Sequence, residues 1–230
     1  MIGVILQARM NSTRLPGKVL AALAGRPMIE HVVRRLRRVR RAKRLIVATG
    51  DSPADDAIAR WADAAGVACF RGSEPDVLDR FYRCARRAGL TTIVRATADN
   101  PLVDPGCADA LIDAHLAGGF DLSTSKCEYG SGLPDGVGLD VLSFEALATS
   151  WREATAPAHR EHVDEYVWAH PDAFRTLVWA APPALRRPEL SLTVDTPDDR
   201  ARVAALLARL GPDTSLADLV ADADSRRNRR

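Results

Sequence analysis

Short apolar runs alternate with longer amphipathic segments along the first hundred residues. The runs are rich in branched aliphatic side chains, which predicts β-strands at residues 2–6, 44–48, 67–70 and 92–95. Between these runs apolar positions recur every three or four residues, as they do on the buried side of a helix. Strands that alternate with helices are typical of a mostly parallel sheet covered on both faces. The pattern therefore predicts an α/β fold.

The same periodicity predicts further elements along the rest of the chain. The first helix is expected to begin at Pro27, since proline suits the first helical position. The last has Thr196 as N-cap, Pro197 at its first position and Gly211 as its stop. Residues 119–138 are predicted to be a loop-rich stretch with one short strand. Helices are expected at 53–65, 75–88, 107–116, 143–153, 161–169 and 197–210, and later strands at 174–179 and 190–194.

The length of the chain suits one domain with one sizeable core. Of 230 residues, 47% are hydrophobic, and no apolar run approaches the roughly eighteen residues that span a bilayer. The N-terminus opens with a strand pattern and lacks the features of an export signal, so a cytoplasmic protein without membrane partners is expected. We expect a domain over residues 1–221 and a basic, flexible tail over residues 222–230.

Cysteine and charge patterns narrow the function classes. Four cysteines stand far apart, without the spacing of a zinc site, and are expected to be reduced thiols. The 32 basic and 30 acidic residues nearly balance, which gives no overall attraction to nucleic acid. Six arginines between positions 34 and 41 could form an RNA- or membrane-binding stripe. No aromatic residue lies among them for base stacking, which favours a solvated helix face.

The loop after the first strand carries three cations, Arg9, Arg14 and Lys18. Arginine can donate two parallel hydrogen bonds to phosphate oxygens, and lysine adds a compact charge. The loop could bind a polyphosphate, although an ordinary basic surface loop is the alternative. It matches neither the P-loop pattern nor the glycine-rich pattern of dinucleotide-binding folds.

Two aspartates follow predicted strands. Asp99 comes just after residues 92–95, and Asp195 just after residues 190–194. Ligands of open α/β sheets bind beyond the carboxyl ends of strands, so both acids could reach the cationic loop. Mg²⁺ takes one or two carboxylates together with substrate phosphates and water, so two aspartates suffice. Alternatively, Asp99 forms a turn before Asn100-Pro101, and Asp195 assists the helix cap.

Several blocks of the sequence resemble the cytidylyltransferase family, which includes 3-deoxy-manno-octulosonate cytidylyltransferases and a spore coat polysaccharide biosynthesis branch. They occur in the family's order along most of the chain. The opening block, over residues 7–18, is too long for a chance motif. The others are Val47-Ala48-Thr49 with Asp51, Phe70-Arg71-Gly72-Ser73, residues 76–81, Ile93-Val94-Arg95 with Thr97, Asp99 and Pro101, residues 160–163, and residues 193–197.

The resemblance implies an activity and a fold. The fold would be the three-layer sandwich of nucleotide-diphospho-sugar transferases, as a homodimer. The reaction would move CMP from CTP to a sugar acid, or to a related hydroxyl- or phosphate-bearing acceptor, in glycan or secondary-metabolite biosynthesis. Arg9, Lys18 and Asp99 would be catalytic, with Arg14 also on the phosphates. Mg²⁺ would bind Asp99 and Asp195.

The family blocks imply further substrate-binding residues. These are Ala8, Thr97, Asp79, Arg80, Asp140 and His162. An ordinary surface ion pair is an equal alternative for Arg80. His159 and His162 are three residues apart, which on a helix would put both rings on one face. A second metal site is one interpretation of this pair, but a buried or interface histidine pair is the commoner outcome.

The chain departs from the family pattern at positions that bear on the acceptor. Ala98 stands where close relatives have glycine, and Asn100 where they usually have cysteine. Gly138 occupies a position usually held by aspartate, and Asp140 replaces a glutamate. The phosphate and metal residues are intact, so these departures leave the acceptor's identity open.

Two other functions compete with nucleotidyl transfer. A glycosyltransferase that uses a nucleotide sugar would share the fold and the metal, but the chain lacks an Asp-x-Asp motif in a mid-chain loop. A non-catalytic nucleic-acid-binding protein would use the arginine-rich helix and tail. It would have no use for a pair of metal-binding aspartates.

Overall fold

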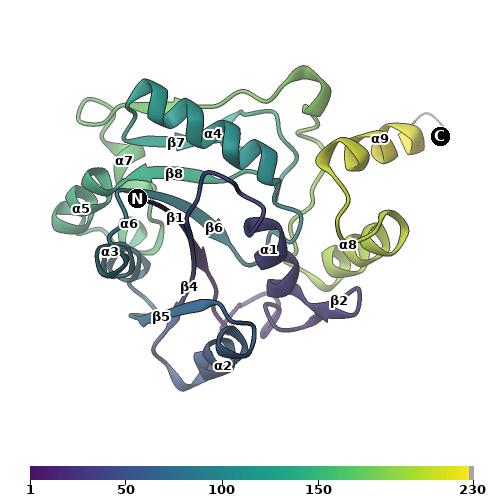
Figure 1. Ribbon diagram of the computed structural model, residues 1–230, viewed down its shortest axis with the longest axis horizontal. Coiled ribbons are helices and arrows are strands. Elements are labelled where there is room, and N and C mark those ends of the chain that lie inside the picture. Colours follow the sequence, from purple (N-terminus) through teal and green to yellow (C-terminus); the bar gives the residue numbers. More distant parts are fainter. Residues whose placement is uncertain (228–230) are drawn as a thin grey trace.

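A seven-stranded sheet lies at the centre of the computed structural model, which describes residues 1–227 (Figure 1). Its strand order is β5-β4-β1-β6-β8-β7-β9, and β8 alone runs against the direction of the others. This confirms the predicted mostly parallel sheet. The strands are β1 (Ile2–Gln7), β4 (Arg44–Gly50), β5 (Ala68–Gly72), β6 (Thr92–Thr97), β7 (Leu122–Thr124), β8 (Asp140–Ser143) and β9 (Thr176–Val178).

Helices cover both faces of the sheet because successive strand residues point to opposite sides. In β1, Val4 and Leu6 pack with α1, α2 and α4, whereas Ile5 packs with α3, α5 and α7. The predicted three-layer sandwich is therefore confirmed. The helices are α1 (Met28–Leu36), α2 (Asp56–Ala64), α3 (Val77–Ala88), α4 (Pro105–Gly118), α5 (Phe144–Glu153), α6 (Pro157–Glu161), α7 (Glu165–Ala169), α8 (Pro197–Leu210) and α9 (Leu216–Arg227).

Smaller elements complete the described chain. A short hairpin of β2 (Ala22–Leu23) and β3 (Arg26–Pro27) precedes α1. A third core cluster joins α8 and α9 to this hairpin and to the segment before α8, through Leu23, Leu192 and Val194. Single 3-10 turns lie at Pro53–Asp55, Cys127–Tyr129 and Pro183–Leu185.

Two predicted elements differ from the structure, and one strand was not predicted. The expected strand at 190–194 is wrong, because the segment makes only one isolated bridge, between Ser191 and Asp135. The helix expected at 161–169 is also wrong in its first half. Residue His162 ends α6 in an extended conformation, and α7 begins only at Glu165. Strand β8 was missed, although its pairing with β6 and β7 fixes that side of the sheet.

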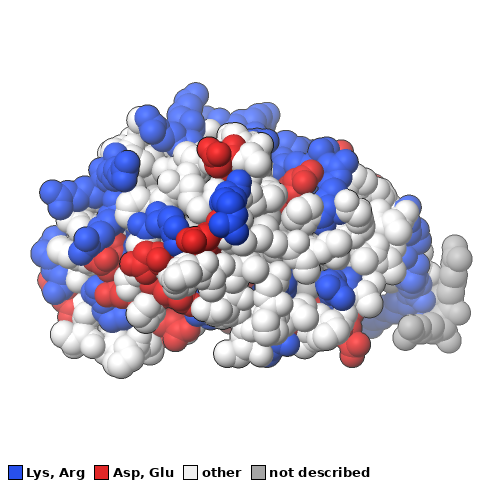
Figure 2. Space-filling view, turned by 90° about the horizontal axis from the view of Figure 1, so that it is seen from below, with Lys and Arg blue, Asp and Glu red and all other residues white. Residues whose placement is uncertain are grey.

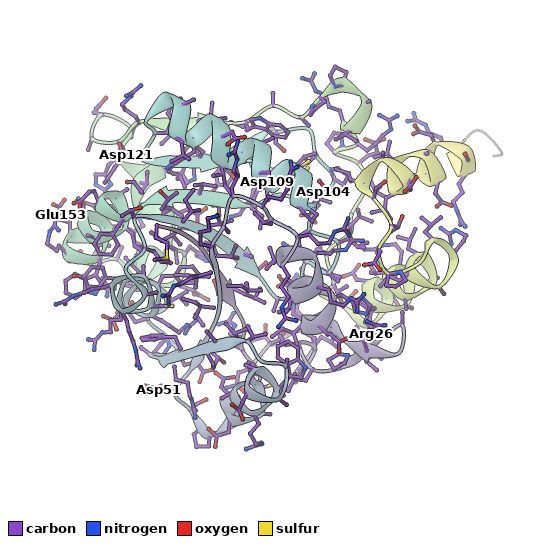
Figure 3. The ribbon with its side chains drawn as sticks, viewed as in Figure 1. Arg26, Asp51, Asp104, Asp109, Asp121 and Glu153 are labelled. Atoms are coloured by element: carbon purple, nitrogen blue, oxygen red, sulfur yellow. The ribbon has the colours of Figure 1, made fainter. Side chains whose placement is uncertain are left out.

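The arginine run after Pro27 is built into the fold. Pro27 is the N-cap of α1 rather than its first helical residue. The guanidinium of Arg35, expected on a solvated face, is buried and donates to the carbonyls of Pro212 (3.3 Å) and Thr214 (2.8 Å). The backbone N–H groups of Arg40 and Arg41 donate to Asp109, which Figure 3 labels on α4. Arginines of this run therefore link α1 and the residues after it to α4 and to the segment before α9. The solvated-face interpretation is wrong for Arg35.

Helix α9 extends into the segment predicted as a basic tail. Helix α9 continues through Asp222 to Arg227, where the sequence suggested a flexible tail. Asp222 accepts from Arg209 at 2.6 Å, and Asp224 pairs with Arg187. Positions 228–230 lie outside the described residues. None of the helices described is long and apolar enough to cross a membrane.

Candidate active site

The cationic loop leaves the carboxyl end of β1 and folds back on itself. The N–H of Met10 donates to Asp55 Oδ1 (2.7 Å), and the N–H of Gly17 donates to the Met10 carbonyl (2.9 Å). Asp55 is buried and also accepts from the N–H of Gly50 (2.9 Å), at the end of β4. One carboxylate thus anchors the loop to the neighbouring strand. Sequence reasoning missed Asp55, because no feature of the neighbouring sequence indicates that its carboxylate contacts the backbone of Met10.

A cavity of about 140 Å³ opens between this loop and the ends of β1 and β6. All three predicted phosphate-binding cations line it, and Thr97, Asp99 and Asp195 line its other side. The full lining is Gln7, Ala8, Arg9, Ser12, Thr13, Arg14, Lys18, Val19, Thr97, Ala98, Asp99 and Asp195. The structure therefore brings together groups that lie up to 188 residues apart, from Gln7 to Asp195.

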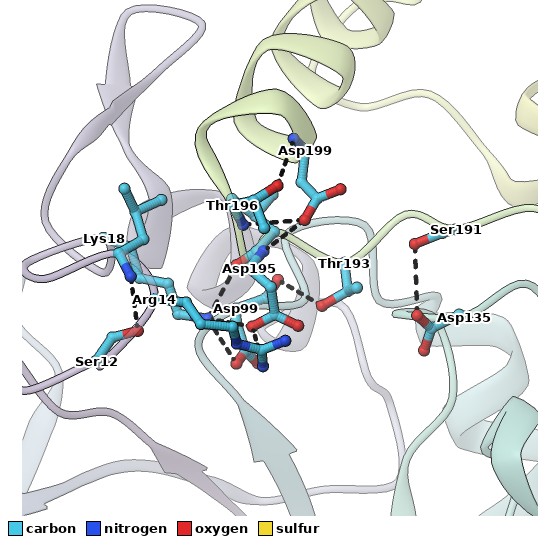
Figure 4. Close-up of polar contacts among 12 residues, drawn as sticks. Ser12, Arg14, Lys18, Asp99, Asp135, Ser191, Thr193, Asp195, Thr196 and Asp199 are labelled. Atoms are coloured by element: carbon cyan, nitrogen blue, oxygen red, sulfur yellow. Dashed lines mark hydrogen bonds and ion pairs between the residues drawn. The ribbon is translucent and has the colours of Figure 1, made fainter.

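Lys18 connects the two aspartates (Figure 4). Its Nζ lies 3.0 Å from Asp99 Oδ2 and 2.8 Å from Asp195 Oδ1, and it donates to the Val194 carbonyl at 2.9 Å. Arg14 Nη2 lies 3.0 Å from the same Asp195 oxygen. Burial acts to raise the pKa of the Asp99 carboxyl, but Lys18 and Thr97 lower it below its ordinary value. Both acids are thus held close to one cationic centre.

The N-terminus of α8 positions Asp195. Thr196 caps the helix by accepting from the Asp199 N–H (3.2 Å), and Asp199 Oδ2 accepts from the N–H groups of Thr196 (2.9 Å) and Asp195 (3.1 Å). These bonds, with that to Arg202, lower the pKa of Asp199 to about 2, although burial acts to raise it. The predicted cap at Thr196 is confirmed. Asp199, the other member of this capping box, holds the backbone N–H of Asp195.

The donor set at this point fits Mg²⁺. Two carboxylates already gather around one cation, and space for phosphates lies beside them in the cavity. No group of three or more His, Cys, Asp or Glu side chains suited to a metal gathers anywhere in residues 1–227.

Other predicted site residues lie around the cavity. Ala8 and Thr97 line it directly. Arg9 also lines it and lies 3.8 Å from Glu161 of α6, so the loop contacts that short helix.

The predicted pair Asp79 and Arg80 does not line the cavity. Asp79 accepts from Trp151 Nε1 (2.8 Å) and pairs with Arg83 (2.8 Å), so it joins α3 to α5. Arg80 is fully buried and donates to the Ser73 and Glu74 carbonyls. Burial lowers the pKa of its guanidinium, and its Nε and Nη2 have no hydrogen-bond partner among the described residues. The surface ion pair considered for Arg80 is therefore wrong.

Asp140 and His162 belong to a neighbouring buried network. Asp140 is fully buried and accepts from Arg95 Nη1 (2.9 Å) and Thr124 Oγ1 (2.8 Å), while Lys126 Nζ lies 2.8 Å away. Asp164 accepts from Arg95 (3.1 Å), Lys126 (3.3 Å) and Tyr129 (3.1 Å). His162 lines a cavity of about 220 Å³ beside Arg95 and Lys126.

The network has balanced charge. Burial acts to raise the pKa of Asp164, but Arg95 and Lys126 lower it far below its ordinary value. Asp164 in turn helps to raise the pKa of Lys126 against the effect of burial. Sequence reasoning missed Lys126, because its acidic partners Asp140 and Asp164 lie 14 and 38 residues further along the chain. The histidine pair expected on one helix face is not formed, since His162 lies beyond the end of α6.

Comparison with known proteins finds a matching family profile and similar sequences. The cytidylyltransferase family profile matches residues 3–204. The chain is 36% identical over 223 residues to the spore coat polysaccharide biosynthesis protein SpsF of Bacillus subtilis, covering 94% of this chain and 91% of that protein. It is 31% identical to the 3-deoxy-manno-octulosonate cytidylyltransferase of Anaeromyxobacter sp. strain K, covering 90% and 98%.

Solved structures show the same architecture. A cytidylyltransferase from Leptospira borgpetersenii superposes with a TM-score of 0.91 at 26% identity, covering 99% of this chain and 95% of that one. A CMP:2-keto-3-deoxy-manno-octonic acid synthetase complexed with CTP superposes with a TM-score of 0.68 at 20% identity, covering 90% and 98%. The second likeness shows the fold alone.

Proposed function

The chain belongs to the cytidylyltransferase family, and on this premise we propose that it transfers CMP from CTP to a hydroxyl group of a sugar acid, with Mg²⁺ as its cofactor. An oxygen of the acceptor would attack the α-phosphorus, the bond from that phosphorus to the bridging oxygen would break, and pyrophosphate would leave with the electron pair. The observation that carries the proposal is the Lys18 ammonium, which lies within 3.0 Å of both Asp99 and Asp195.

The cationic loop would hold the triphosphate. Arg9, Arg14 and Lys18 all face the first cavity, where a triphosphate brings about four negative charges. Such a ligand gives Arg14 and Lys18 new anionic partners in exchange for the carboxylates they now contact. Catalysis of phosphoryl transfer depends mainly on alignment and on charge neutralisation, and these cations supply both.

Asp99 and Asp195 would hold the metal. Bound Mg²⁺ would neutralise charge on the phosphates and lower the pKa of the acceptor hydroxyl. Each acid has fixed backbone surroundings, since the N–H of Val194 donates to the Asp99 carbonyl (2.9 Å) and Asp199 holds the N–H of Asp195. These hydrogen bonds fix the backbones that carry the two acids.

Nucleotide binding tests the proposal first. A thermal-shift series with the four nucleoside triphosphates, with and without Mg²⁺, should show stabilisation by CTP with Mg²⁺, because a ligand that binds only the folded state raises its stability. Pyrophosphate release with CTP, Mg²⁺ and a series of sugar acids tests the transfer. Release of nucleoside diphosphate from a nucleotide sugar would instead support the glycosyltransferase.

A homodimer is part of the same proposal, because the family resemblance implies one. Sedimentation at several protein concentrations measures the mass directly. A species with the mass of one chain, 24.9 kDa, at all concentrations would refute this part and leave the proposed chemistry unaffected.

A further inference from the structure

A second cavity, of about 320 Å³, lies next to the nucleotide cavity. The two share Thr97, Asp99 and Asp195 in their linings. No residue of the cationic loop lines the second cavity among the described residues. A molecule in it would therefore reach the two acids from a direction that the loop leaves open, as an acceptor must.

The wall of this second cavity is polar throughout. No aromatic or large aliphatic side chain of the described residues lines it. The wall offers hydrogen-bond donors in Lys126 and Asn100, and acceptors in Glu128 and Asp135. A hydroxyl group both donates and accepts, so a ligand with several hydroxyl groups matches such a wall. An apolar ligand would leave these groups without partners.

The two cations on this wall are already neutralised. Arg95 and Lys126 each contact Asp140 and Asp164, and Lys126 Nζ also lies 3.4 Å from Glu128. A ligand carboxylate would therefore meet cations that already have anionic partners. Arg95 is 7% exposed, and its Nε is buried without a partner among the described residues.

Asp135 is the acid on this wall without a cationic partner in the described chain. Its Oδ2 accepts one long hydrogen bond, from Ser191 Oγ at 3.4 Å (Figure 4). Its backbone is fixed, because its N–H donates to the Leu190 carbonyl (2.9 Å) and its carbonyl accepts from the Leu192 N–H (2.8 Å). Its exposed carboxylate therefore has unused acceptor capacity on a fixed backbone, and is suited to bind donors of a ligand.

Two glycines hold the segment that carries Asp135 in place. Gly136 has φ +83°, and a Cβ there would lie 2.4 Å from the backbone nitrogen of Thr193. A Cβ on Gly138 would lie 2.3 Å from the Ser125 carbonyl oxygen. Gly138 therefore lies closer to the backbone of Ser125 and Lys126 than a residue with a side chain could in this arrangement.

We propose that Asp135 binds hydroxyl groups of the acceptor at the end remote from its reacting oxygen, so that this enzyme selects sugar acids with a hydroxylated chain. The inference rests on the proposed function, because it takes the second cavity as the acceptor site. The reacting end would lie near Asp99 and Asp195, and the remote end would lie against Asp135 and Asn100. Asp135 is then a residue for acceptor specificity.

Calorimetric titration tests this directly. The probes are 3-deoxy-manno-octulosonate and a shorter 2-keto-3-deoxy sugar acid with fewer hydroxyl groups, each added with Mg²⁺ and a non-hydrolysable CTP analogue. The wild-type protein should bind the longer acid about tenfold or more tightly than the shorter one. Asp135→Ala should weaken binding of the longer acid about ten- to hundredfold and remove the preference, with the affinity for the CTP analogue unchanged.

Controls separate this inference from the proposed function. Asp63→Asn, at an exposed position that lines neither cavity, should behave as wild type, and Asp135→Asn keeps the shape of the side chain if the alanine variant unfolds. Wild-type affinity for the longer acid in both Asp135 variants would overturn the inference, as would the absence of binding by either acid. Failure of the CTP analogue to bind would overturn the proposed function. The titrations with the two sugar acids are repeated without nucleotide, so that binding of the sugar acid is measured independently of binding of the CTP analogue.

Discussion

Lys18 balances the charge at the centre of the site. Its side chain is almost fully buried and contacts two acids, Asp99 and Asp195, that lie 96 residues apart in the chain. Both acids are partly exposed, at 32% for Asp99 and 23% for Asp195, so water shares in their solvation. The Lys18 ammonium lies between the two acids that we propose as metal ligands. Binding of Mg²⁺ to both acids would therefore be coupled to a movement of this ammonium.

Replacement of Lys18 by methionine should expose this coupling. The variant leaves two carboxylates close together without their shared cation, which should lower the free energy of unfolding by about 1–3 kcal/mol. Added Mg²⁺ should raise the melting temperature of the variant more than that of wild type. Thermal unfolding over a series of Mg²⁺ concentrations measures both effects. Lys43→Met, at an exposed site, is the control, and equal stability of the Lys18 variant and wild type would contradict the prediction.

Asp99→Asn should remove catalysis while the protein stays folded. The amide keeps the shape of the side chain but binds a divalent cation poorly, so we expect CMP transfer to fall about a hundredfold or more. Pyrophosphate release measures the rate, and circular dichroism checks the fold. Turnover close to that of wild type would exclude Asp99 as a metal ligand.

At the scale of elements, the N-terminus of α8 is more than the end of a helix. Its capping box places the Asp199 carboxylate against the backbone N–H of Asp195. The preceding residue, Val194, donates its N–H to the Asp99 carbonyl. The stability of this helix end and the position of a proposed metal ligand therefore depend on the same hydrogen bonds.

Thr196→Ala should affect both stability and activity. Loss of the cap should cost about 1 kcal/mol of unfolding free energy. The shifted Asp195 should lower kcat about three- to tenfold, because catalytic groups tolerate little displacement. Ser143→Ala is a matched control, since Ser143 caps α5 by accepting from the Ala146 N–H (3.0 Å), away from both cavities. It should lose similar stability with unchanged kcat. Chemical denaturation and steady-state kinetics compare the two, and equal kcat in both would refute the link.

At the scale of the whole molecule, one face shows basic and acidic side chains next to each other. The face in Figure 2 shows Lys and Arg with Asp and Glu among them. The arginines after α1 already have hydrogen-bond partners. Arg40 donates to Asp109, Arg41 donates to Asp113, and Arg37 donates to a backbone carbonyl. Nucleic-acid binding would instead need a continuous basic surface that is free to contact phosphates. Both the family and this distribution favour a small-molecule enzyme.

The pH dependence of folding should reflect His115, which is buried between α4 and β7. Burial lowers the pKa of His115 to about 4 from its ordinary value of 6.5, and its Nδ1 lies 3.0 Å from Ser123 Oγ. Below pH 6.5 the unfolded chain binds a proton there that the folded protein does not, so stability should fall as the pH drops from 6.5 to 4. The full effect is on the order of 3 kcal/mol.

Urea unfolding at several pH values measures this effect. His115→Gln should flatten the profile between pH 6.5 and 4, although His31, whose pKa burial also lowers, keeps part of the slope. His162→Gln, at an exposed position, should leave the slope unchanged. A His115→Gln profile as steep as that of wild type would contradict the assignment.

The sequence by itself determined the features that depend on neighbours along the chain. The strands near residues 2–6 and 44–48 and the helix over 197–210 follow from local periodicity and capping, and the structure has them. The cations at 9, 14 and 18 and the acids at 99 and 195 were also found from the sequence, since each lies beyond a predicted strand. Local patterns carry such information because side-chain direction repeats with the backbone period.

Only the tertiary structure decided which distant residues meet. It placed Asp79 against Trp151, buried Arg80 beneath the turn at Ser73, and left residues 190–194 with a single bridge. It also assembled Arg95, Lys126, Asp140 and Asp164 into one network beside the second cavity. These outcomes depend on pairing between segments far apart in the chain. The free energy of such pairing comes from burial and hydrogen bonding that no local window of the sequence contains.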